Sequence, residues 1–160
     1  MTTPRTCGSC IACCVAFDVG ALEKPTMTPC RHLAAAGGCA IYAARPDGCR
    51  EFECGWMTSE EGRWDDDERP DRLGVVVAQD AETAFTRATG IPLLVAYELR
   101  PHALESRQAG RLVERLARRR LVGFLRYGWE CGDREPSAFV GPPELLRVSR
   151  VCDARRRMTA

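Results

Sequence analysis

The second half of the chain shows two kinds of hydrophobic pattern, and each predicts a different element. Short apolar runs at 73–78, 91–99 and 121–127 are typical of strands. Residues 105–120 instead carry apolar side chains at helical spacing, with arginines on the opposite side. The apolar positions of that helix are Ala109, Leu112, Val113, Leu116 and Ala117. The order β, β, α, β predicts an α+β fold in which one amphipathic helix covers one face of a small sheet.

The first third of the chain has no comparable pattern and is dominated by cysteine. Residues 1–57 are too few for an independent core of ordinary depth, and domains of that size usually need a disulfide or a metal as a staple. Eight of the ten cysteines of the chain lie there, namely Cys7, Cys10, Cys13, Cys14, Cys30, Cys39, Cys49 and Cys54. We therefore expect a small metal-stapled module of short helices and turns, packed with the sheet.

Two short helices are expected in this module. Thr6 can cap a helix that begins at Cys7, and the first four cysteines would then share an arc of about 120° on one helix face. Thr28 and Pro29 are typical of a helix start, and they predict a second helix over 30–36.

The net charge is +1, but acidic and basic residues are unevenly distributed. Residues 58–72 carry seven acidic and three basic side chains, which is typical of an exposed acidic linker or loop. Residues 73–160, the α+β region with its basic C-terminal tail, carry fifteen basic and ten acidic side chains. The arginine face of the 105–120 helix could contact an acidic partner. The modest overall charge and the absence of a nucleic-acid motif do not favour nucleic acid as that partner.

The sequence also carries signals about the compartment. No apolar run approaches the roughly 18 residues that a membrane span needs. No apolar stretch of signal-peptide length precedes Cys7. We therefore expect a cytoplasmic protein without a membrane partner. Because the cytoplasm is reducing, so many cysteines there indicate metal ligands rather than disulfides.

The thiolates suit several kinds of metal site. Structural zinc ions take four ligands, so eight cysteines match two ions, and the adjacent Cys13 and Cys14 could each ligate a different one. The spacing C-x2-C-x2-C also opens the bacterial ferredoxin pattern, but here it runs directly into Cys14. Zinc is the first expectation, an iron–sulfur cluster or another iron site the second, and disulfides or free thiols the third. Arg31, Arg45 and Arg50 could supply the cations that an anionic sulfur site needs, although a solvated surface position is favoured for each.

Other candidate residues carry weaker signals. His32 could replace a thiolate as a ligand, although a position beside the ligands or at a helix cap is favoured for it. His102 is expected to be a capping or surface residue, and Cys131 and Cys152 to be small buried apolar residues. The sequence holds no motif of a serine hydrolase, a zinc protease or a phosphate-binding loop, so enzymatic activity is left open.

Other residues that lie between the eight clustered cysteines complete a wider sequence pattern. They are Pro29, His32, Leu33, Gly38, Ile41, Tyr42, Arg45, Pro46, Arg50 and Phe52. Together with the cysteines, over residues 7–57, this pattern resembles the bacterial CxxCxxCC family, described as zinc- or iron-chelating cysteine-cluster proteins. The resemblance implies that the eight cysteines are the binding site, and it leaves the metal open. A similar cluster occurs in flagellin lysine methylases, which suggests iron–sulfur chemistry. Those enzymes are much longer, so their activity is not carried over.

The sequence thus predicts a metal-binding protein that holds zinc through its N-terminal thiolates, largely as a structural element, with a protein client or partner. The alternative is an iron–sulfur protein that acts in electron transfer or as the cluster part of a redox or modifying enzyme. A third hypothesis is a module that delivers its ion to a client.

Overall fold

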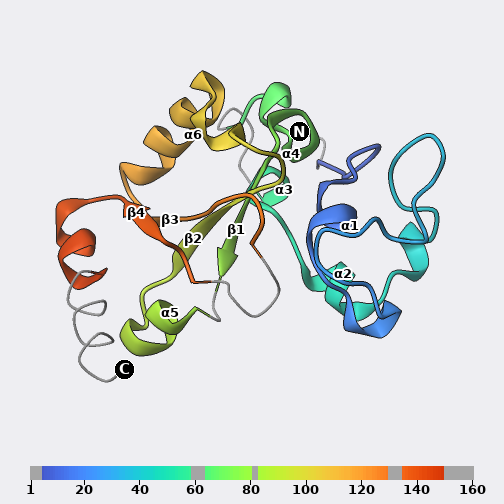
Figure 1. Ribbon diagram of the computed structural model, residues 1–160, viewed down its shortest axis with the longest axis horizontal. Helices are drawn as coiled ribbons and strands as arrows, with labels where there is room; N and C mark the ends of the chain where they lie inside the picture. Colours follow the sequence, from blue (N-terminus) through green and yellow to red (C-terminus); the bar gives the residue numbers. More distant parts are fainter. Residues whose placement is uncertain (1–4, 59–63, 81–82, 130–134, 150–160) are drawn as a thin grey trace.

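The computed structural model describes residues 5–58, 64–80, 83–129 and 135–149, and its centre is a four-stranded mixed sheet (Figure 1). The strands lie across the sheet in the order β1 (Val75–Asp80), β2 (Leu93–Glu98), β3 (Val122–Leu125) and β4 (Ala138–Val140). β1 and β4 are antiparallel to their neighbours, whereas β2 and β3 are parallel. A parallel pair needs a crossover, which η4 (Ala103–Glu105) and α6 (Arg107–Ala117) supply. The predicted α+β class is confirmed.

The three predicted strands and the amphipathic helix are present within a few residues of their expected bounds. Ser106 caps α6 by accepting a hydrogen bond from the Ala109 N–H at 3.2 Å, and Ala109 and Leu112 are buried. Among the elements that were not expected are β4 and α5 (Ala84–Thr89). Both are too short to show a hydrophobic period. α5 depends on its N-cap, in which the Thr83 hydroxyl oxygen accepts a hydrogen bond from the Thr86 N–H.

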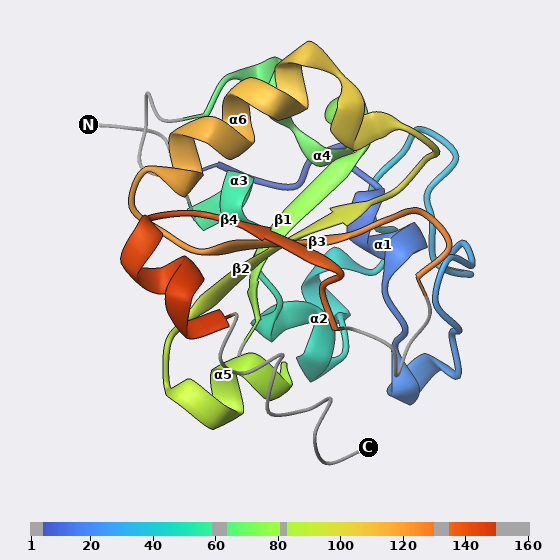
Figure 2. The ribbon, with the colours of Figure 1, turned by 60° about the vertical axis from the view of Figure 1, so that its left-hand side comes forward.

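The two faces of the sheet have separate cores. Because side chains alternate along a strand, Val75 and Val77 of β1 pack with α6, whereas Val76 and Ala78 pack with the cysteine-rich segment and α5. Figure 2 shows α6 over one face, and α5 and α2 (Asp47–Glu51) on the opposite side. The helix predicted to cover one face is therefore joined by a second layer.

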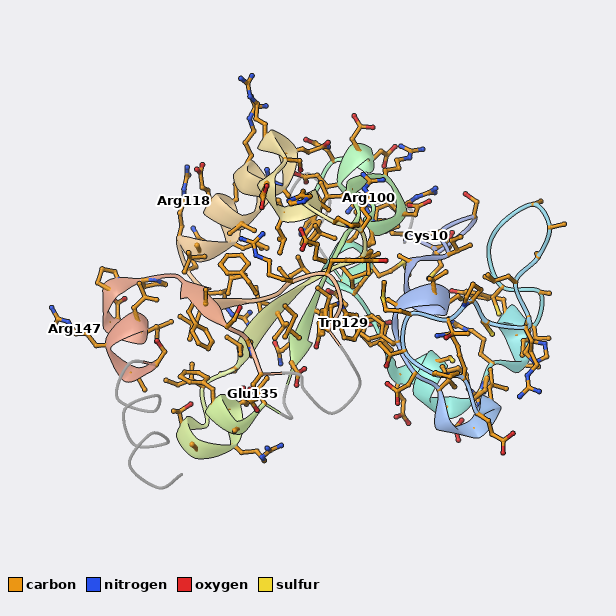
Figure 3. All side chains as sticks on the ribbon, viewed as in Figure 1. Cys10, Arg100, Arg118, Trp129, Glu135 and Arg147 are labelled. Atoms are coloured by element: carbon orange, nitrogen blue, oxygen red, sulfur yellow. The ribbon has the colours of Figure 1, made fainter. Side chains whose placement is uncertain are left out.

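The N-terminal segment, residues 5–58, lies beside β1 (Figure 1) and is called the cysteine module below. Its helices are α1 (Ala12–Ala16), η1 (Gly20–Leu22), η2 (Tyr42–Ala44), α2 and α3 (Gly55–Thr58). Phe17 joins the module to the sheet, with ring centroids 4.7 Å from Phe52, 4.9 Å from Tyr97 and 5.5 Å from Trp129. Trp129 lies where the module meets the sheet (Figure 3). The module thus shares the core of one sheet face.

The prediction that the first helix begins at Cys7 is wrong. Gly8 has a left-handed φ of 51°, and the Cys10 N–H donates to the Cys7 carbonyl at 2.8 Å. These residues form a turn, and α1 begins only at Ala12. The cap offered by Thr6 did not decide the backbone, because the first helical turn is costly to form and tertiary contacts override so weak a preference.

The helix expected over 30–36 is absent. The segment forms consecutive turns, and Leu33 pairs with Cys39 in an isolated antiparallel bridge. The Ala40 N–H donates to the His32 carbonyl at 2.8 Å, so the chain doubles back on itself. A helix of seven residues is marginal in isolation, and this loop is instead held by contacts with the Cys7–Cys10 turn.

The acidic segment is packed, not an exposed linker, from residue 64 onward, where the structure describes it. It contains η3 (Asp66–Glu68) and α4 (Pro70–Leu73), and Trp64, Glu68 and Pro70 are buried. The Glu68 carboxylate accepts hydrogen bonds from Arg115 of α6 at 2.6 Å and from the Asp65 N–H at 2.9 Å. Asp65, Asp66 and Asp67 are exposed, as the charge count predicted. Glu68 is buried, because the partly exposed Arg115 guanidinium offsets the desolvation of its carboxylate.

Replacing Glu68 by alanine should destabilise the protein by about 2 kcal/mol, because it removes hydrogen bonds to a charged group and leaves the Asp65 N–H without this acceptor. Urea unfolding measures the change. Glu114→Ala is the matched control, since Glu114 is exposed on α6, and it should change the free energy of unfolding by less than about 0.5 kcal/mol. Equal losses for the two variants would contradict the role assigned to Glu68.

The last described segment, 143–149, is helical. Its Leu145, Leu146 and Val148 pack against the core on the face of the sheet opposite α6. The basic tail beyond it, with Cys152, lies outside the described residues, as does Cys131. Within the described ranges, the structure holds no helix of sufficient length and apolarity to cross a membrane.

Candidate metal centre

The cysteine module and the sheet form the walls of an open cavity of about 700 Å³, and most of the module's cysteines border it. They are Cys7, Cys10, Cys13, Cys14, Cys30, Cys39 and Cys49. Cys54 borders a second, much smaller cavity of about 20 Å³ together with Cys7, Cys10 and Cys13. The structure therefore gathers all eight predicted cysteines around two adjoining cavities, although they come from segments up to 47 residues apart in the sequence.

Four cysteines come from the first turn and from α1. Cys7 and Cys10 lie on the turn, and Cys13 and Cys14 lie on α1. Ala12 and Ala16 are the buried face of this helix and seat it against the sheet. Short apolar side chains at these two positions let the helix backbone approach closely, which brings its cysteines to the boundary between module and sheet.

Cys30 and Cys39 are positioned by the loop that doubles back. The Cys30 N–H donates to the Cys14 carbonyl at 3.0 Å, which holds this loop against the end of α1. Gly38 has a left-handed φ of 80°, and a Cβ there would lie 2.4 Å from the Gly8 carbonyl oxygen. Only glycine allows this close backbone approach, so Cys39, the next residue, depends on it for its position.

Cys49 and Cys54 follow in the last part of the module. Cys49 lies in α2, and Cys54 precedes α3, where its carbonyl accepts from the Met57 and Thr58 N–H groups at 2.9 and 3.1 Å. Trp56 of α3 is buried in the core on the α6 side of the sheet. α3 therefore ties Cys54 to the body of the protein, whereas α2 leaves Cys49 facing the larger cavity.

The sulfur atoms share cavities but do not converge on one point. Among the residues that the structure describes, no group of three or more Cys, His, Asp or Glu side chains is close enough to hold a metal ion. The eight module cysteines are free thiols. Their metal ligation stays a prediction, for which the chemistry of the donors fits: eight half-buried thiols border two adjoining cavities.

Burial keeps several of these thiols protonated when no metal ion is bound. It raises the pKa of Cys10 to about 11, with the Asp71 carboxylate acting in the same direction, and it raises the pKa of Cys49 and of Cys54. Removing these groups from water penalises the thiolate. Cys13 and Cys14 behave as a pair: the Cys13 thiol donates to the Cys14 sulfur, which lowers the pKa of Cys14 to about 7 and raises that of Cys13.

One cation at the site was missed in the sequence. Lys24, the only lysine, is buried at 7% exposure and donates from Nζ to the carbonyls of Val15, Phe17 and Pro25. It satisfies carbonyls at the end of α1, and its charge acts on Cys14 and on neighbouring thiols. A lone lysine in a cysteine-rich segment was the available signal, but only the fold shows that it is buried.

Of the three arginines expected to balance the sulfur charge, only Arg45 borders the cavity. Its guanidinium stacks on the Tyr42 ring with 3.7 Å to the centroid, and its charge lowers the pKa of Cys14, although less than the hydrogen bond from Cys13 does. Arg31 instead donates to the Leu22 carbonyl, and Arg50 pairs with Asp47 at 2.5 Å. Neither of these two lines the cavity, and both are exposed, which is the surface position that the sequence favoured.

The two histidines are placed differently. His32 borders the cavity, and its backbone N–H donates to the Cys30 sulfur at 3.5 Å, a position beside the thiols as favoured. His102 is exposed and contacts Glu105 through Nδ1 at 3.2 Å, as expected of a surface residue.

The sheet contributes a polar pair to the cavity that no sequence motif indicated. The Tyr97 hydroxyl donates to the Asp80 carboxylate at 2.6 Å, and both residues are buried and line the cavity. A second buried carboxylate, Glu98, is structural, because it accepts from the Leu104 and Tyr127 N–H groups at 3.0 and 2.8 Å. It thereby fixes the loops that follow β2 and β3.

In metal-free protein near neutral pH, Cys14 should be alkylated faster than Cys10 or Cys49, because thiolate is the reactive form and the Cys14 pKa is about 7. Its rate should rise between about pH 6 and 8 and then level off, while the Cys10 rate keeps rising to higher pH. Pulsed iodoacetamide with peptide mass spectrometry measures both rates. Faster modification of Cys10 at pH 7 would contradict the assignment.

Comparison of the whole chain with family models, with curated proteins and with solved structures finds no match. The function of the protein is therefore inferred from the geometry and the donor chemistry of this site.

Proposed function

We propose that this protein is a cysteine-cluster metal-binding protein whose N-terminal thiolates hold zinc, largely to fix the cysteine module against the sheet. The observation that carries the proposal is the gathering of eight free cysteines from separate turns and short helices around two adjoining cavities. Thiols that merely filled a core would be expected to be dispersed among apolar side chains.

A structural role fits the short elements of the module. Its longest helices have five residues, and helices so short are not stable alone. Thiolate–metal bonds would link the first turn, α1, the doubled-back loop and α2, and the binding free energy would then act as folding free energy. The α+β region would then be the part that contacts a protein client.

The size of the larger cavity favours a second candidate. About 700 Å³ exceeds what single ions need, and Cys14, Cys30, Cys39 and Cys49 all border it. An iron–sulfur cluster held there would make the protein an electron carrier or the cluster part of a redox or modifying enzyme.

Metal content tests both candidates. The protein is purified under anaerobic conditions, and zinc, iron and acid-labile sulfide are measured per chain, together with the visible spectrum. Colourless protein with stoichiometric zinc supports the first candidate, and brown protein with equal iron and sulfide supports the second. Cys152→Ser, which changes a cysteine outside the module, should keep the wild-type metal content. If wild-type protein lacks metal even after anaerobic reconstitution with either metal, the proposed function is wrong.

A further inference from the structure

The small cavity has the composition of a site for one ion. Four of its nine lining residues are cysteines, and the other five are apolar. The cysteines are Cys7, Cys10, Cys13 and Cys54, and the apolar residues are Ala12, Trp56, Met57, Pro70 and Val76. Its volume of about 20 Å³ is roughly that of one water-sized sphere. Four sulfur donors around room for one ion match the four-coordinate preference of structural zinc.

The other four cysteines border only the larger cavity, and they also lie near one another. The thiols close enough to Cys49 to act on it are Cys14, Cys30 and Cys39. Cys7 acts in the same way on Cys54 and on Cys13, and Cys10 acts on Cys13. Cys13 also donates a hydrogen bond to Cys14, so the two groups adjoin at these consecutive residues.

The groups meet at Cys13 and Cys14. Consecutive residues on a helix point about 100° apart, so the side chains of Cys13 and Cys14 on α1 can face different metal ions. Cys13 borders both cavities, as Cys7 and Cys10 also do, whereas Cys14 borders only the larger one and Cys54 only the small one.

Charged groups are unevenly distributed between the two sides. Lys24 acts mainly on Cys30 and Cys14 and less on Cys13, and Arg45 acts on Cys14 and Cys49. Asp71 lies against Cys10 in the other group, and Arg69 binds that carboxylate through two hydrogen bonds of 2.7 Å. A divalent ion with four thiolates keeps a net charge of −2, which nearby cations stabilise.

The two sides differ in their access to solvent. The small cavity is covered by buried residues, including Trp56 at 7% exposure and Val76 at 1%. The larger cavity has Tyr42, 42% exposed, on its rim. An ion on the first side would be enclosed, and an ion on the second would be within reach of a small chelator or a client.

We propose that the cysteine module holds two separate four-thiolate metal sites: a closed one formed by Cys7, Cys10, Cys13 and Cys54, and an open one formed by Cys14, Cys30, Cys39 and Cys49. This inference rests on the proposed function and specifies its ligand sets. Binding would have to draw each set together, because no three of the described ligand side chains are close enough to share an ion. The open site exchanges its ion first, and the closed site keeps its ion until the module unfolds.

Metal counting on single variants tests the division. Full-length protein is reconstituted with Zn²⁺ under anaerobic conditions, and bound zinc is measured after gel filtration. Wild type and Cys152→Ser should hold two zinc ions per chain, and Cys49→Ser and Cys54→Ser should hold one each. Two sites that shared ligands would lose both ions in either variant, and that result would overturn the inference.

A measurement on the wild type remains decisive if a variant fails to fold. Zinc-loaded protein is exposed to EDTA, and thiols freed after release of the first equivalent are alkylated and mapped by mass spectrometry. We expect labels on Cys14, Cys30, Cys39 and Cys49 and protection of the other four. Labels mixed between the two sets, or release of both ions in one phase, would refute the division while leaving metal binding intact. Failure of the wild type to bind zinc or iron would instead refute the proposed function itself.

Discussion

Removal of the proposed zinc by a chelator is expected to raise the rate of tryptic cleavage in the cysteine module about a hundredfold. Such a rise corresponds to about 3 kcal/mol of local unfolding free energy, less than the roughly 10 kcal/mol or more that structural zinc contributes in zinc-finger peptides. The sensitive sites should be Arg31 and Arg50, which lie on the short segments that the metal would link. Limited proteolysis under reducing conditions, followed by mass spectrometry, measures the rates.

The sheet supplies the internal control for this experiment. Arg111 is exposed on α6, which packs on the face of the sheet away from the larger cavity, and its cleavage should change far less. Added Zn²⁺ should restore resistance in the module. If metal-free and zinc-loaded protein are cut at the same rate, the metal is not structural, and the hypothesis of a module that delivers its ion to a client gains support.

Replacing Phe17 by alanine should lower the free energy of unfolding by about 3 kcal/mol, the low end of the range for large-to-small aromatic changes, since Phe17 is half-buried. Its ring contacts Phe52 within the module and both Tyr97 and Trp129 of the sheet. The variant therefore loses the contact that joins the two parts. Urea unfolding followed by tryptophan fluorescence measures the effect.

Tyr42→Ala is the matched control for Phe17→Ala, because Tyr42 is an aromatic residue of the same module that is 42% exposed. It should change stability by less than about 1 kcal/mol. Phe17→Leu should recover part of the loss, since it retains apolar volume. A Phe17→Ala loss no larger than that of Tyr42→Ala would show that the aromatic contacts do not hold the module on the sheet.

The elements that the sequence predicted well are those with a clear hydrophobic pattern. β1, β2 and β3 follow apolar runs and are buried on both faces of the sheet, and α6 buries one periodic set of side chains that includes Ala109 and Leu112. The expected helices of the cysteine module lacked such a period and rested on capping residues alone. In that region the left-handed backbone of Gly8 and the contact between Gly38 and Gly8 decided the conformation.

The sequence by itself determined which residues could carry chemistry: eight clustered cysteines, too few apolar positions around them for a separate core, and an α+β region to pack against. Only the tertiary structure decided how these thiols are grouped, that Lys24 rather than Arg31 or Arg50 lies beside them, and that Asp80 and Tyr97 line the same cavity. The physical reason is that spacing along a chain sets local geometry within about one helical turn. The approach of residues far apart in sequence depends instead on which faces are buried together, here through Ala16, Phe17 and Trp129.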